Sequence, residues 1–141
     1  MEDNPSAVEL AQHAFAINDY TGRIDVCRDG EQALDFLLCR NGKSDRDPND
    51  HASLILLDLK MPKVDGFEVL EQVRANPRYR STPVVVLTAS SNYLDINRAY
   101  KLGANSYLVK PVDFDQFVKL IGQVTDYWCK LNQAPPIDDP A

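Results

Sequence analysis

Five residues of this chain could do chemistry together. Asp58 ends the apolar run "LILL", Thr88 ends "PVVVL", and Lys110 follows "SYLV". Glu2 and Asp3 stand just before the first predicted helix. In an open parallel sheet, ligands bind outside the carboxyl ends of the strands, so these side chains are expected on one rim. Carboxylates suit Mg²⁺, while a lysine and a hydroxyl can hold phosphoryl oxygens, which leaves Asp58 to act as a nucleophile.

The elements that must position these residues are short apolar strands alternating with amphipathic helices. This alternation is typical of an α/β fold with a doubly wound, mainly parallel sheet. Asn4 is expected as a helix N-cap with Pro5 in the first turn, and Gly103 as a left-handed residue that ends a helix. We predict helices over residues 5–19, 31–40, 66–75, 93–104 and 114–131, strands over 23–30, 54–57, 83–90 and 106–109, and a polar loop over 41–52.

Length and composition limit the classes of protein. The 141 residues are expected to form one domain over residues 1–132, followed by a Pro- and Asp-rich disordered tail over 133–141. A net charge of −6 argues against nucleic-acid binding through a basic face. No apolar run reaches the roughly 20 residues of a membrane helix, and no signal peptide precedes the first helix. Three cysteines, Cys27, Cys39 and Cys129, without a CxxC pair favour free thiols and a cytoplasmic location.

Four motifs in order resemble the receiver domain of two-component response regulators. They are "EDNP", "LILLDLKMPKVDGFEVL", "VVVLTAS" and "SYLVKPVD", and the resemblance runs from residue 2 to about residue 131. The chain looks most like the stand-alone regulators that are paired with phytochrome-type histidine kinases. The resemblance implies a flavodoxin-like receiver fold, a histidine kinase as partner, and output through protein contacts in a phosphorelay.

The resemblance also implies a role for each residue of the rim. Asp58 corresponds to the phosphoacceptor and Asp3 to a direct Mg²⁺ ligand. Glu2 corresponds to a ligand that acts largely through water, and the backbone carbonyl of Lys60 completes the metal shell.

The resemblance assigns the remaining roles to three further residues. Thr88 and Lys110 hold the phosphoryl group, and Tyr107 corresponds to an aromatic switch coupled to Thr88. Considered singly, each has a simpler interpretation: Lys110 as a solvated lysine, Thr88 as a strand-end hydrogen-bonding residue, and Tyr107 as a packing residue.

The chain departs from the family pattern at its beginning. Receivers place an apolar strand before the acidic pair, at the centre of the strand order 2-1-3-4-5, whereas this sequence begins Met1-Glu2-Asp3. A missing central strand leaves two inner edges unpaired. Three explanations are open: a start site placed too late, a strand supplied by another chain, or a true truncation. We favour the first, because every downstream motif is intact.

Other function classes remain open at this stage. A Mg²⁺-dependent phosphatase would also use an aspartate nucleophile, but Lys60 occupies the place where such hydrolases keep a second aspartate. A receiver-like adaptor that is never phosphorylated and a defective receiver fragment are the remaining alternatives. The last predicted helix carries more apolar residues than one sheet face needs, so we expect a homodimer or partner surface formed by the last strand and the last helices.

Overall fold

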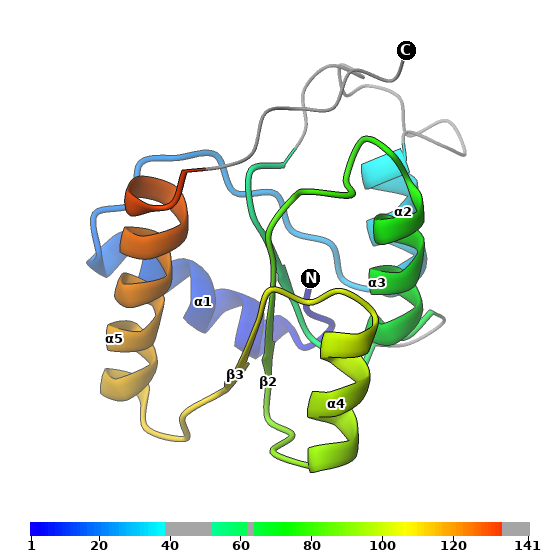
Figure 1. Ribbon diagram of the computed structural model, residues 1–141. Coiled ribbons are helices and arrows are strands. Elements are labelled where there is room, and N and C mark those ends of the chain that lie inside the picture. Colours follow the sequence, from blue (N-terminus) through cyan, green and yellow to red (C-terminus); the bar gives the residue numbers. More distant parts are fainter. Residues whose placement is uncertain (39–51, 62–63, 134–141) are drawn as a thin grey trace.

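The structure, a computed structural model, describes residues 1–38, 52–61 and 64–133. Figure 1 shows a small sheet with helices on both sides, α1 and α5 on one side and α2, α3 and α4 on the other. The helices are α1 (Pro5–Ile17), α2 (Gly30–Leu38), α3 (Gly66–Ala75), α4 (Tyr93–Lys101) and α5 (Phe114–Thr125), and a π-helical turn η1 (Asp126–Leu131) follows α5. The strands are β1 (Ile55–Leu57), β2 (Val84–Thr88) and β3 (Ser106–Val109).

The three strands form a parallel sheet in the order β1-β2-β3. Ile55 pairs with Val84, and Thr88 pairs with Val109. All five residues of β2 are buried, as expected for a strand covered by helices on both faces. The predicted α/β architecture is therefore confirmed, and the parallel arrangement brings the carboxyl ends of the strands to one rim.

Side-chain caps explain where the helices begin. Asn4 accepts hydrogen bonds from the N–H groups of Ser6 and Ala7, as predicted for the start of α1. Asp65, Asn92 and Asp113 cap α3, α4 and α5 in the same way. Gly103 has a φ of 105° just after α4, so the predicted left-handed residue is confirmed.

The predicted strand over residues 23–30 is wrong. Its alternating side chains suit a strand, but a strand also needs a neighbour for its backbone groups, and residues 21–28 are irregular in the structure. In the described part of the chain, one backbone hydrogen bond joins the chain's beginning to this segment, from the Glu2 N–H to the Cys27 carbonyl at 2.9 Å. The end of the second predicted helix, the loop over 41–51 and the tail over 134–141 lie outside the described residues.

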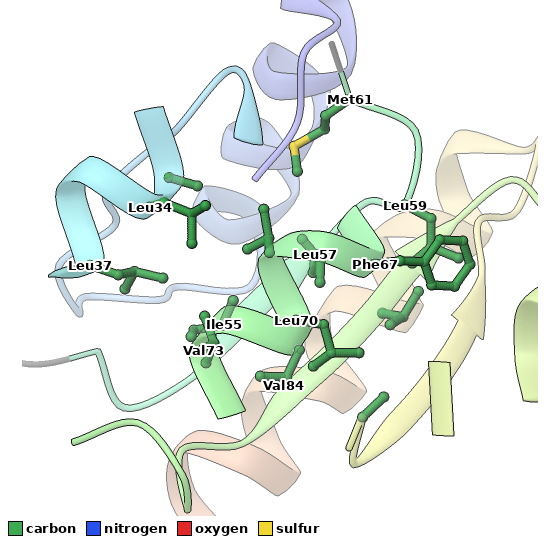
Figure 2. Close-up of a cluster of buried hydrophobic side chains, with 14 of the residues drawn as sticks. Leu34, Leu37, Ile55, Leu57, Leu59, Met61, Phe67, Leu70, Val73 and Val84 are labelled. Carbon is green, nitrogen blue, oxygen red and sulfur yellow. The ribbon is translucent and has the colours of Figure 1, made fainter. Parts of the chain in front are cut away.

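The core is divided between the two faces of the sheet. Figure 2 shows the larger cluster, in which Leu57 of β1 lies among side chains of α2 and α3 such as Leu34 and Leu70. The smaller cluster joins Leu87 of β2 to Phe117 of α5 and to α1. Because α5 packs against α1 as well as the sheet, much of its apolar surface is already covered. No helix in the described part of the chain is long and apolar enough to cross a membrane.

Candidate functional site

Asp58 follows β1 directly and lies at the rim of the sheet. Its N–H donates to the Met1 carbonyl at 3.1 Å, and its Oδ1 accepts the Lys60 N–H at 3.2 Å. The side chain is 12 % exposed, so it is largely withdrawn from solvent but still reachable. Burial of a carboxylate is unfavourable unless charged or hydrogen-bonding groups surround it.

The chain leaves Asp58 through a turn that α3 holds in place. The Gly66 N–H donates to the Leu59 carbonyl at 2.9 Å. A Cβ atom at Gly66 would lie 2.3 Å from the Asp58 carbonyl oxygen and 2.6 Å from the Leu59 Cα. Only glycine allows this approach, so the first turn of α3 fixes the backbone beside the carboxylate.

Three carboxylates gather at the rim, as the sequence predicted. One oxygen atom each from Glu2, Asp3 and Asp58 can be chosen so that all lie within 4.8 Å of one another. The Asn4 N–H donates to Glu2 Oε1 at 3.2 Å, so the capped start of α1 positions the acidic pair. An all-oxygen donor set of this size fits a hard cation such as Mg²⁺. The predicted ligation by the Lys60 carbonyl has no observation bearing on it and stays a prediction.

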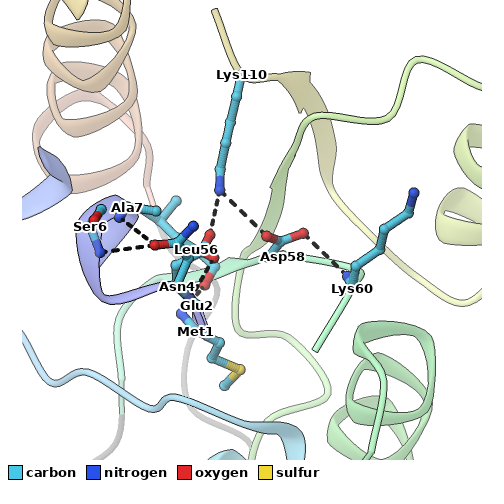
Figure 3. A network of polar contacts seen from close by, with 9 residues as sticks. All are labelled: Met1, Glu2, Asn4, Ser6, Ala7, Leu56, Asp58, Lys60 and Lys110. Carbon is cyan, nitrogen blue, oxygen red and sulfur yellow. Dashed lines mark hydrogen bonds and ion pairs between the residues drawn. The ribbon is translucent and has the colours of Figure 1, made fainter. Parts of the chain in front are cut away.

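Lys110 is not the solvated surface lysine of the simpler interpretation. Figure 3 shows its ammonium group between two carboxylates, donating to Glu2 and, at 3.4 Å, to Asp58 Oδ2. Its side chain is 22 % exposed. The Lys110 N–H donates to the Thr88 carbonyl at 2.8 Å, so the end of β3 is fixed to the end of β2. The lysine is therefore held over the carboxylate by the sheet itself.

The charged groups at the rim shift one another's pKa values. Burial would raise the pKa of Asp58, but its hydrogen bond with Glu2 and the charge of Lys110 outweigh burial and lower that pKa. Burial raises the pKa of Glu2, and only part of this is offset by Lys110. Burial would lower the pKa of Lys110, yet the two carboxylates raise it. The lowered pKa favours the ionised form of Asp58, the form in which a carboxylate acts as a nucleophile.

Thr88 and Tyr107 lie on neighbouring strands beside this cluster. Thr88 is buried, with 1 % of its surface exposed, and its hydrogen bond with Asp58 helps to lower the pKa of that carboxyl group. Tyr107 is half-buried, and its hydroxyl donates to the Ser90 carbonyl at 2.8 Å. Ser90 in turn donates to Asp95 of α4 at 2.6 Å. The tyrosine is therefore tied to the loop that leads from β2 into α4.

Sequence reasoning missed two contributors to the site. Met1 joins the rim through its backbone, since its ammonium group donates to the Leu56 carbonyl at 2.7 Å and its carbonyl accepts the Asp58 N–H. Ser90 takes part through its carbonyl, the acceptor for Tyr107. Both contacts use main-chain atoms, and no side-chain pattern in the sequence marks them.

Residues 1–122 match the response regulator receiver domain. The chain belongs to this family. It is 42% identical over 135 residues to the probable methanogenesis regulatory protein FilR2 of Methanothrix harundinacea, covering 96% of this chain and 84% of that protein. It is 33% identical over 135 residues to response regulator Rcp1 of Synechocystis, covering 96% and 90%.

Solved structures of receiver proteins have the same fold. The phosphorylated cyanobacterial phytochrome response regulator RcpA superposes with a TM-score of 0.88 at 32% identity, covering 96% of this chain and 94% of that one. The Mn²⁺-bound form of Rcp1 superposes with a TM-score of 0.81 at 33% identity, covering 96% and 95%. The three strands of this receiver, in the order β1-β2-β3, correspond to the last three strands expected from the family fold.

Proposed function

We propose that this receiver accepts a phosphoryl group from a histidine kinase on Asp58 and thereby changes its contacts with other proteins. The observation that carries the proposal is that Asp58 lies beside the Lys110 ammonium group and in one acidic cluster with Glu2 and Asp3. A largely buried carboxylate whose pKa is lowered, with a cation beside it, is suited to attack phosphorus. The phosphatase alternative would need a general acid, and Lys60 has no carboxylate to offer.

In the proposed reaction, an Asp58 oxygen attacks the phosphorus of a phosphohistidine on the kinase. A new O–P bond forms, the P–N bond breaks, and its electron pair leaves with the imidazole, so that Asp58 carries an acyl phosphate. Lys110 stands close enough to pair with a phosphoryl oxygen, and Thr88 offers a hydroxyl at the neighbouring strand end. A Mg²⁺ ion held by Glu2, Asp3 and Asp58 would supply positive charge that offsets the charge of the phosphoryl oxygens.

The switch assigned to Thr88 and Tyr107 extends this proposal. The Tyr107 hydroxyl is bonded to the Ser90 carbonyl, and Ser90 is bonded to the first turn of α4. If Thr88 turns towards a phosphoryl group, space beside Tyr107 changes, and the loop into α4 can move with it. Phosphorylation would then shift the population of two states of this face rather than create a new one.

The proposed partner of the site is a phytochrome-type histidine kinase. Support comes from the similarity to RcpA, a cyanobacterial phytochrome response regulator. The proposed dimer or partner surface lies on α4, β3 and η1, where large apolar side chains are exposed. These are Tyr93, Leu94, Tyr100, Val109 and Tyr127.

The direct test is the intact mass of the protein after incubation with acetyl phosphate and Mg²⁺. We expect one phosphoryl adduct that hydroxylamine removes, and no adduct on Asp58→Asn. Asp115→Asn is the matched control, because Asp115 is an exposed aspartate in the first turn of α5 and should leave phosphorylation unchanged. A folded wild-type protein without an adduct would favour the adaptor alternative instead.

A further inference from the structure

Two hydrogen bonds in series run from β3 through the loop after β2 into α4, which lie next to one another in Figure 1. Tyr107 pairs with Val86 of β2 in the sheet, and its hydroxyl extends to the Ser90 carbonyl, to which it donates at 2.8 Å. The Ser90 hydroxyl in turn donates to Asp95 Oδ2 at 2.6 Å. Asp95 belongs to the first turn of α4. Ser90 therefore links the tyrosine to the helix, with its carbonyl on one side and its hydroxyl on the other.

The Ser90 hydroxyl is fixed by its two partners. It donates to Asp95 and accepts the Asn92 N–H at 3.3 Å. A serine hydroxyl has a single proton, so donation to the carboxylate sets the orientation of the side chain. Hydrogen bonds to a carboxylate are also shorter and stronger than those between neutral groups. Asp95 thereby restrains Ser90 as a whole, including the carbonyl that Tyr107 uses.

The two halves of α4 differ in how firmly they are held. Tyr93 and Leu94 at its start are 82 % and 76 % exposed, whereas Ala99 in its second half is fully buried. The bond between Ser90 and Asp95 thus attaches an exposed first turn to the loop. Because the buried half anchors the helix, Asp95 is a fixed point to which the loop is tied.

We propose that Asp95 is a positioning residue for Tyr107: through the Ser90 hydroxyl it holds the Ser90 carbonyl where the tyrosine hydroxyl binds. This inference deepens the proposed function and rests on it, since it names the residue through which a change at Tyr107 would reach α4. Coupling free energy is reciprocal. The contribution of Asp95 to holding Tyr107 therefore equals the contribution of Tyr107 to holding the first turn of α4.

The test is a double-mutant cycle on the unphosphorylated full chain, with urea unfolding followed by circular dichroism. Tyr107→Phe removes the hydroxyl, and should lower the folding equilibrium constant by about fivefold in the otherwise wild-type protein, the usual effect of one hydrogen bond. In Asp95→Ala, the same change should lower that constant by less than about twofold, because the Ser90 carbonyl is no longer held in place.

Three further variants separate positioning from helix stability. Asp115→Ala removes an exposed aspartate from the first turn of α5, so Tyr107→Phe should keep its fivefold effect there. Asp95→Asn keeps an oxygen that can accept from Ser90, so most of the effect should remain. Ser90→Ala removes the donor and should behave as Asp95→Ala does. If Asp95 only stabilised its own helix, Tyr107→Phe would have the same effect in every one of these proteins.

The proposal is overturned if Tyr107→Phe has an equal effect in the wild-type protein and in Asp95→Ala. The proposed function is tested separately by the intact mass after incubation with acetyl phosphate. A missing adduct together with a diminished effect in Asp95→Ala would contradict phosphorylation and support the positioning role. An adduct on Asp58 together with an undiminished effect would support phosphorylation and overturn the positioning role.

Discussion

The two sides of β1 differ in a way that explains much of this receiver. On one side, β1 pairs with β2 in continuous register and β2 pairs with β3, so backbone groups and side chains are buried together. On the other side, among the described residues, backbone bonds to β1 come from Met1 at the C-terminal end of the strand, and a cavity of about 590 Å³ lies beside the rest. One edge of β1 is thus paired inside the core, whereas its other edge is largely unpaired among the described residues.

The comparison shows which parts of the rim depend on which side. Asp58, Thr88 and Lys110 leave strands of the paired side, so the sheet itself sets their spacing. Glu2 and Asp3 come from the open side, where they depend on two Met1 hydrogen bonds and on the capped start of α1. Changes on the open side should therefore alter phosphorylation through the affinity for Mg²⁺, while the spacing of Asp58, Thr88 and Lys110 stays the same.

The largest expected effect is a difference in the loss of stability between a substitution on the paired side of β1 and one on the open side. Leu57→Ala removes a side chain that is 1 % exposed in the main core, and it should lower the free energy of unfolding by about 2–5 kcal/mol. Leu10→Ala makes the same change at a cavity-lining residue that is 47 % exposed, and should cost less than about 1 kcal/mol. Urea unfolding followed by circular dichroism measures both. Equal losses would mean that the open side is as well packed as the paired side.

The next effect concerns the lysine of the paired side. Lys110→Ala should slow phosphorylation by acetyl phosphate by about 100-fold, because the phosphoryl oxygens lose a pre-positioned cation. The rate of adduct formation by mass spectrometry gives the measurement. Lys119→Ala, an exposed lysine of α5, is the control and should react at the wild-type rate. An unaffected rate in Lys110→Ala would remove this lysine from the proposed mechanism.

The smallest effect tests whether the cap of α1 positions the metal ligands. Asn4→Ala and Asn92→Ala each remove an N-cap side chain, and each should lower stability by about 1 kcal/mol. Only Asn4→Ala should also weaken Mg²⁺ binding, measured by calorimetry, because Asn4 adjoins Glu2 and Asp3. If both variants bind Mg²⁺ equally well, the cap has no part in holding the acidic pair.

The sequence predicted the elements whose signals are local. The apolar runs that form β2 and β3, and the cap Asn4 that begins α1, depend on neighbours only a few residues away. The approach of Asp58, Thr88 and Lys110 could also be predicted, since parallel strands end at the same rim.

Features that depend on distant partners could not be predicted. The segment over residues 23–27 alternates as a strand does, but no strand within residues 1–38, 52–61 and 64–133 pairs with its backbone, so it stays irregular. The Tyr107 hydroxyl donates to the backbone carbonyl of Ser90, 17 residues away. No pattern of side chains in the sequence marks this contact. The helix α5 carries more apolar side chains than one face of the sheet can cover. Part of this apolar surface packs against α1, a contact between distant segments of the chain.

The central claim is that the paired side of β1 carries a phosphorylation site at Asp58. Its most direct test is to trap the acyl phosphate by borohydride reduction, which converts the modified aspartate to homoserine, and to locate the product by peptide mass spectrometry. The account predicts homoserine at position 58 alone, in a reaction that requires Mg²⁺. Homoserine at another aspartate, such as Asp3, or its absence from a folded protein that forms no phosphoryl adduct, would contradict it.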